Sequence, residues 1–155
     1  MNINIRGRLF DLSKPKVMGI LNLTPDSFYD GGVHNEINKI EDHVNKMVND
    51  GMDILDIGGY SSKPGAKNIS VDEELSRVIP ILKHIRKIFP ELVISIDTFR
   101  SKIASASLNE GADIINDISG GTLDKNMMSV VAKNNCPYIL MHMQGNPQNM
   151  QNDPS

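Results

Sequence analysis

The chain has 155 residues, 39% of them apolar, and can bury the core of a single globular domain, which we place at residues 1–155. A net charge of −3 with interspersed lysines and glutamates gives no basic stripe for nucleic acid. No apolar run approaches the roughly 20 residues that span a bilayer, and the N-terminus lacks the apolar segment of a secretory signal, so we expect no membrane partner. The sequence has one cysteine, Cys136, which cannot form an internal disulfide. We therefore expect the protein in the reducing cytoplasm.

The first predicted element is a small N-terminal hairpin over residues 3–12, where apolar residues alternate around Gly7. We expect this hairpin to cover one end of the fold. Five nearly continuous apolar runs follow it. They predict parallel strands buried on both faces, at residues 17–21, 54–57, 93–96, 113–115 and 138–141.

Helical patterns separate these strands. Apolar residues at helical spacing over 37–48 predict the first helix. A capping box of Ser70 and Glu73 begins the second helix, and Pro80 predicts a kink within it. The alternation of strand and helix indicates an α/β fold without a linker or a domain break. Two shorter helices are predicted at 101–110 and 124–133.

Polar residues follow the apolar runs. In repeated βα folds, ligands bind beyond the carboxyl ends of the strands, so these residues are the first candidates for a site. Each could instead form a turn where the chain leaves the core. Together, a ring of amides and carboxylates suits a flat heterocycle that has many donors and acceptors. The polar positions are Asn22, 58–66, Asp97, Asn116, Asp117, His142 and Gln144.

Five motifs resemble the dihydropteroate synthase family in the family's own order. The resemblance implies a pterin-binding (β/α)8 TIM barrel, present here as about its first five βα units with an N-terminal hairpin. It also implies condensation of 6-hydroxymethyl-7,8-dihydropterin pyrophosphate with p-aminobenzoate, which gives 7,8-dihydropteroate and pyrophosphate with Mg²⁺ present. The motifs are MGILNLTPDSFYDGG, DIGGYSSKPGA, SIDTFRS, IINDISGG and LMHMQGNPQNMQ.

The resemblance assigns roles to individual residues. Asn22 is similar to the family's metal-contacting asparagine, and an amide oxygen is a suitable ligand for Mg²⁺. Asp97 and Asn116 resemble the pair that contacts the pterin edge, with turn formation as the alternative for all three. Ile118 and Met141 resemble apolar walls against the ring, although both could equally be barrel core.

The segment from Thr24 to Gly32 resembles the family's first loop, which closes over the reacting centre. Closure would exclude water while the pyrophosphate leaves. An Asx-rich structural turn is the alternative for this segment. The residues expected to take part in closure are Thr24, Pro25, Asp26, Ser27 and Phe28.

The second loop departs from the family pattern Glu-Ser-Thr-Arg-Pro-Gly. Ser62 keeps a hydroxyl, and Lys63 keeps a charge that could contact pyrophosphate, without the bidentate geometry of arginine. A solvated loop lysine is the alternative for Lys63. Tyr60 replaces an acid. Asp56 lies inside a strand and needs a hydrogen-bonding partner that the sequence does not identify, and His142 is interpreted as structural.

A complete (β/α)8 barrel takes about 250 residues, whereas this sequence predicts five strands. We therefore interpret the chain as the N-terminal portion of the synthase and expect no turnover by these residues alone. Two alternatives remain, a pterin-binding methyltransferase module and an inactive fragment, although 22–28 and 61–65 favour pyrophosphate chemistry over methyl transfer. For the full-length enzyme, the resemblance leaves a homodimer open.

Overall fold

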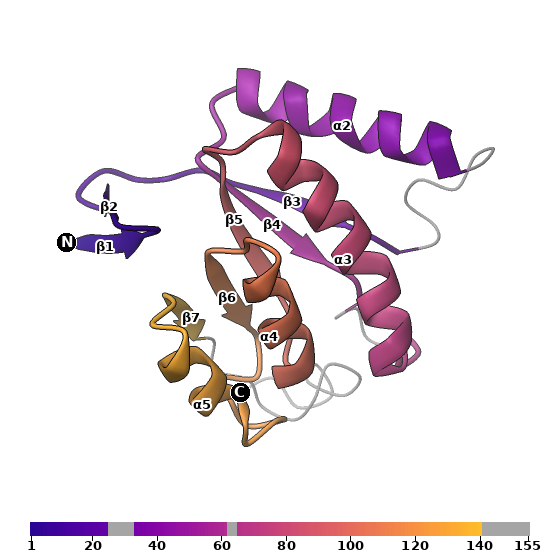
Figure 1. Ribbon diagram of the computed structural model, residues 1–155, viewed down its shortest axis with the longest axis vertical. Coiled ribbons are helices and arrows are strands. Elements are labelled where there is room, and N and C mark those ends of the chain that lie inside the picture. Colours follow the sequence, from indigo (N-terminus) through magenta and orange to yellow (C-terminus); the bar gives the residue numbers. More distant parts are fainter. Residues whose placement is uncertain (25–32, 62–64, 141–155) are drawn as a thin grey trace.

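A five-stranded parallel sheet forms the centre of the protein (Figure 1). The computed structural model describes residues 1–24, 33–61 and 65–140. The strands pair in chain order, each parallel to the next. They are β3 (Met18–Asn22), β4 (Ile54–Gly58), β5 (Val93–Asp97), β6 (Ile114–Asp117) and β7 (Tyr138–Leu140).

In the part of the chain that the structure describes, four helices alternate with these strands and lie against one face of the sheet (Figure 1). Sequential strand order with the helices on one face is the winding of a barrel, because a doubly wound sheet has helices on both faces. The structure therefore confirms the predicted α/β fold with five βα-type strands of a TIM barrel. The helices are α2 (Val33–Asn49), α3 (Val71–Ile88), α4 (Ser101–Asn109) and α5 (Met127–Lys133).

The structure corrects several of the predicted element bounds. The apolar-run criterion ended strands too early, since backbone pairing includes the polar residues Asn22, Asp97 and Asn116. The last helix begins at Met127 and not at residue 124, because the side chain of Asp124 accepts hydrogen bonds from the N–H groups of Asn126 and Ser101. Helix α3 runs through Pro80, as predicted, and the hydroxyl of Ser70 caps it; the kink at Pro80 stays a prediction.

Two apolar clusters fill the two faces of the sheet. The larger cluster packs α2 to α5 against alternate strand residues such as Leu55 and Ile94. The smaller one lies on the opposite face, at the amino ends of the strands, where Ile5 contacts Ile54, Val93 and Ile114. Ile5 belongs to the hairpin of β1 (Asn2–Ile5) and β2 (Arg8–Asp11), which lies on the other side of the sheet from α3 (Figure 1). The predicted hairpin thus exists, and it covers the amino end.

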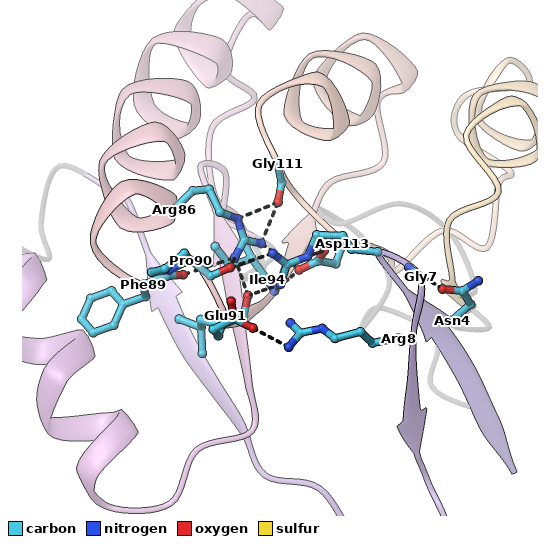
Figure 2. Close-up of polar contacts among 12 residues, drawn as sticks. Asn4, Gly7, Arg8, Arg86, Phe89, Pro90, Glu91, Ile94, Gly111 and Asp113 are labelled. Atoms are coloured by element: carbon cyan, nitrogen blue, oxygen red, sulfur yellow. Dashed lines mark hydrogen bonds and ion pairs between the residues drawn. The ribbon is translucent and has the colours of Figure 1, made fainter.

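A half-buried arginine joins the connections at this amino end. The guanidinium of Arg86, on α3, donates to the carbonyl of Leu92 at 2.6 Å and to that of Gly111 at 2.7 Å. It also pairs with the carboxylate of Asp113 at 2.8 Å. Figure 2 shows Arg86 and Asp113 facing each other between α3 and the hairpin. These contacts, which we call the Arg86 clasp, fix the chain just before β5 and just before β6.

Arg6 extends the clasp into the hairpin. Its Nε lies 2.8 Å from Asp113 Oδ1, and its Nη1 donates to the carbonyl of Pro90 at 2.7 Å. Asp113 is buried, so its two arginine partners compensate for the loss of hydration. The amino end is therefore held by charge pairing as well as by apolar contact. No helix within the described residues is both long and apolar enough to cross a membrane.

Replacing Arg86 should be costly. We expect Arg86→Met to lower the free energy of unfolding by about 3 kcal/mol, because it removes one partner of a buried carboxylate. The matched control is Arg8→Ala, which breaks an exposed ion pair with Glu91 and should cost less than about 1 kcal/mol. Urea unfolding followed by circular dichroism measures both. Equal losses in the two variants would contradict a stabilising clasp.

Candidate functional site

Four residues form a row across the carboxyl ends of the strands. Asn22 pairs with Gly58, Gly58 with Asp97, and Asp97 with Asn116. Register partners in a parallel sheet point to the same face, and neighbouring strands lie about 4.8 Å apart. This face is the one that carries the hairpin at its other end, opposite the helices. The register thus brings together the three predicted polar residues Asn22, Asp97 and Asn116. We call these three residues and Gly58 the terminal row.

Gly58 keeps the middle of the terminal row open. A Cβ atom at this position would lie 3.3 Å from the Cβ of Asp97, which is tighter than an ordinary contact. Asn22, on the other side of Gly58, has an exposed side chain. The missing side chain therefore leaves space between the amide of Asn22 and the carboxylate of Asp97.

A second polar pair lies one step deeper on the same face. Asp56 and Ser95 are paired in the sheet and are both buried, at 2% and 0% exposure. The amide nitrogen of Asn116 donates to Asp56 Oδ2 at 3.3 Å, which identifies the partner that the sequence left unnamed. Within the described residues, Asn116 Oδ1 has no hydrogen-bonding partner, and the hydroxyl of Ser95 faces the carboxyl group of Asp56. The face therefore presents a buried polar atom whose bonding capacity is unused.

Asp97 is held by a residue that sequence reasoning did not assign to it. The hydroxyl of Tyr60 donates to Asp97 Oδ1 at 3.0 Å, and Tyr60 is buried at 8% exposure. Burial, together with the nearby charge of Asp56, raises the pKa of Asp97 to about 7. Burial also raises the pKa of Asp56, and the neighbouring Ser95 and Asn116 side chains only partly offset this. The site therefore holds two carboxyl groups that take up protons more readily than usual.

The first turn of α3 supports the loops that follow β4 and β5. Glu74 is fully buried and accepts hydrogen bonds from Thr98 Oγ1 at 2.8 Å and from Arg100 Nη1 at 3.0 Å. Arg77 donates to the carbonyl of Gly59 at 2.9 Å. The sequence showed Glu74 only as a helical residue near a cap, because its partners lie more than 20 residues away. These bonds fix the chain directly after Asp97 and Gly58.

Asp117 follows Asn116 but points to the opposite face and does not belong to the site. Its carboxylate accepts hydrogen bonds from the N–H groups of Ser119 at 2.8 Å and Gly121 at 3.0 Å, and from the hydroxyl of Tyr138 at 2.6 Å. These bonds shape the turn after β6, where Gly121 has a φ of +87°. Here the turn-forming alternative explains the polar residue after the strand.

The structure describes only some of the remaining predicted site residues. Ile118, directly after β6, is buried at 9% exposure, and Thr24 is half-buried two residues after β3. Whether Ile118 forms a wall against a ring stays a prediction. The other predicted positions lie outside the described residues: Pro25, Asp26, Ser27, Phe28, Ser62, Lys63, Met141 and His142.

Among the described residues, Asn22 offers an exposed oxygen that suits a hard cation. The described residues contain no cluster of three or more His, Cys, Asp or Glu side chains that could hold a metal. Mg²⁺ often takes one or two protein oxygens and completes its octahedron with water and substrate phosphate. The exposed amide of Asn22, next to the space left by Gly58, is compatible with such a ligand.

A hollow of about 600 Å³ lies at the other end of the molecule, between the hairpin and the chain that precedes β5. Its lining is mainly apolar, and its charged residues have partners: Arg8 pairs with Glu91, and Asp53 accepts a hydrogen bond from the N–H of Val17. No set of unpaired polar groups converges there among the described residues. The terminal row is therefore the better candidate for a functional site.

Sequential parallel strands with polar residues at their carboxyl ends define an α/β protein of the barrel class, in which ligands bind at these ends. The chain belongs to the pterin-binding enzyme family, whose model matches residues 18–155. The resemblance noted from the five motifs is thereby confirmed.

Curated relatives carry names from folate synthesis. The mitochondrial folate synthesis bifunctional protein of Arabidopsis thaliana is 50% identical over 151 residues, which cover 96% of this chain and 27% of that protein. The dihydropteroate synthase of Escherichia coli K12 is 47% identical over 154 residues, which cover 99% of this chain and 54% of that enzyme. The chain therefore spans about a quarter of the first relative and about half of the second.

Solved structures agree with the computed fold. The Yersinia pestis dihydropteroate synthase, solved with a sulfonamide drug, has a TM-score of 0.88 and 42% identity, over 100% of this chain and 56% of that one. The Xanthomonas albilineans enzyme, solved with 4-aminobenzoic acid, has a TM-score of 0.85 and 40% identity, over 93% of this chain and 52% of that one.

The raised pKa of Asp97 predicts a pH-dependent stability. A carboxyl group that binds its proton more tightly in the folded state than in the unfolded state stabilises the fold at low pH, and this contribution is lost as pH rises from about 4 to about 7. Asp97→Asn should therefore flatten the decrease in the free energy of unfolding between pH 4 and pH 8, by about 2–4 kcal/mol. Urea unfolding at a series of pH values measures this.

Asp124→Asn provides a control in which the effect on stability should change with pH in the opposite direction. Although burial acts to raise the pKa of Asp124, the N–H groups of Ser101 and Asn126 bond to its carboxylate and lower the pKa overall. Removing this acid should cost stability above pH 4 and have little effect below it. Identical pH profiles for the Asp97→Asn variant and the parent would contradict the assignment.

Proposed function

We propose that the protein carrying this chain is a dihydropteroate synthase, which joins 6-hydroxymethyl-7,8-dihydropterin pyrophosphate to p-aminobenzoate. The products are 7,8-dihydropteroate and pyrophosphate. The observation that carries the proposal is the terminal row, with Asp97 and Asn116 above the buried Asp56. The names of the relatives support synthesis of dihydropteroate over the methyl-transfer alternative.

Asn116 is oriented to accept a hydrogen bond from a ligand. Its amide nitrogen donates to Asp56, so its Oδ1, which has no partner among the described residues, is left to receive an N–H. Asp97 in its ionised form is also an acceptor, with Oδ1 bonded to Tyr60. A pterin presents adjacent N–H donors along its aminopyrimidine edge, so two neighbouring acceptors match that edge.

The reaction forms a C–N bond and breaks a C–O bond. The amine of p-aminobenzoate attacks the methylene carbon of the pterin, the pyrophosphate leaves with the bonding electrons, and the amine loses a proton. Holding both reactants in line contributes a large part of such a rate, worth up to about 7–11 kcal/mol in well-oriented systems. Asp97 and Asn116 would supply the pterin half of that orientation, with Ile118 and Met141 beside the ring.

Mg²⁺ would be held by Asn22 and, when bound, supplies positive charge that stabilises the leaving pyrophosphate. Ser62 and Lys63 are proposed to contact the same anion. The segment of Thr24, Pro25, Asp26, Ser27 and Phe28 is proposed to close over the site and exclude water. The 4-aminobenzoic acid named with the Xanthomonas albilineans enzyme supports p-aminobenzoate as the second substrate.

The location proposed for the protein is the cytoplasm. The support is chemical: Cys136 is the single cysteine of the sequence, and it is half-buried with a free thiol whose pKa burial raises. Such a thiol is stable in a reducing compartment.

The decisive test is ligand binding by the protein and its Asp97→Ala variant. Calorimetry with the pterin pyrophosphate should show a loss of about 1–3 kcal/mol in binding free energy for Asp97→Ala, because N–H donors of the ligand lose their partner. The affinity for p-aminobenzoate should change far less. Release of pyrophosphate in the presence of both substrates and Mg²⁺ tests the reaction itself. Unchanged pterin affinity in the variant would remove Asp97 from the site.

Lys63 allows a separate test of pyrophosphate contact. Lys63→Arg should preserve or improve the affinity for pyrophosphate, since a guanidinium can bond two oxygens, whereas Lys63→Ala should weaken it. Lys67→Ala, four residues along the same connection, is the control for a general loss of positive charge. If pyrophosphate binds the parent, both Lys63 variants and the control equally well, Lys63 is a solvated loop residue.

A further inference from the structure

Tyr60 lies where its hydroxyl reaches the pterin-facing carboxylate. It follows Gly58 and Gly59 at the carboxyl end of β4, and its hydroxyl donates to Asp97 Oδ1 at 3.0 Å. At 8% exposure, its phenol ring is enclosed by the protein. A phenol can donate this hydrogen bond, whereas an ionised carboxylate at the same position could not.

The phenol ring is fixed from its other side. Tyr60 meets Phe99 edge to face, with ring centroids 5.1 Å apart and an interplanar angle of 84°. The guanidinium of Arg100 lies 5.1 Å above the Phe99 ring, and Arg100 in turn bonds the buried carboxylate of Glu74. A chain of contacts from α3 thus restricts where the Tyr60 hydroxyl can lie.

We propose that Tyr60 is a positioning residue of the pterin site, which holds Oδ1 of Asp97 so that Oδ2 is left for the ligand. The proposal rests on the proposed function. Tyr60 acts through Asp97 and need not touch the substrate. Gly58 lies beside the free oxygen, since a Cβ there would be 3.6 Å from Asp97 Oδ2, so that side of the carboxylate borders the open part of the terminal row.

The charges around Asp97 give the hydrogen bond a second effect. Acidic groups on three elements act on Asp97 through their charge: Asp56 on β4, which lies on the same face of the sheet, and Glu74 on α3 and Asp117 on β6, which lie on the other side. All three favour its protonated form, and the hydrogen bond from Tyr60 opposes them. Without that bond Asp97 would be protonated at a higher pH, and a protonated carboxyl group is a poorer acceptor for N–H donors.

The experiment compares the protein with Tyr60→Phe, which keeps the ring and removes the hydroxyl. The control is Tyr138→Phe, which removes the 2.6 Å hydrogen bond of a tyrosine to Asp117 on the opposite face. Two readouts are used. Carbon-13 NMR follows the titration of the Asp97 carboxyl group without any ligand, and calorimetry with 6-hydroxymethylpterin gives the affinity between pH 6 and pH 9.

In Tyr60→Phe the Asp97 titration should move upward by about one pH unit, and pterin affinity near pH 7 should fall about fivefold and recover toward pH 9. Tyr138→Phe should leave both unchanged. An unmoved Asp97 titration, a pH-independent loss of affinity, or an equal effect of Tyr138→Phe would each overturn the proposal. If the parent fails to bind 6-hydroxymethylpterin, the proposed function fails, and the Asp97 titration still decides whether Tyr60 controls that carboxyl group.

Discussion

The register of the parallel sheet is the constraint on which the rest of the structure depends. Side chains alternate between the two faces, so a slip of one residue in β5 would turn Asp97 toward the helices and Ile96 away from them. The apolar residues that pack against α2 to α5 fix that register through their burial. The same packing therefore decides which polar residues meet in the terminal row.

The two ends of the strands have opposite electrostatic character. At the amino end, the buried Asp113 has two arginine partners, and apolar residues of the hairpin cover the strands. At the carboxyl end, the buried Asp56 and the half-buried Asp97 have amide or hydroxyl partners in place of cations. Burying carboxylates without cations is unfavourable. The carboxyl end thus keeps polar groups that can still form hydrogen bonds, and a binding site requires such groups.

The strands and helices could be read from the sequence because apolar spacing reports burial locally. The polar residues of the terminal row could also be predicted from the sequence, since Asn22, Asp97 and Asn116 each stand at the end of an apolar run within a recognisable motif. The contacts of Tyr60 with Asp97 and of Asn116 with Asp56 could not be predicted, because they join residues 37 and 60 positions apart. Such pairings depend on the register of neighbouring strands and on side-chain rotamers, which no local pattern encodes.

The separation of the Arg86 clasp from the terminal row has an evolutionary consequence. Stabilising contacts and ligand-facing residues occupy opposite ends of the same strands, so a substitution at one end leaves the packing of the other intact. A substitution at Tyr60, in the loop after β4, would therefore leave the Arg86 clasp intact. Residues at the carboxyl end can change without loss of the framework that holds the strands at their amino ends.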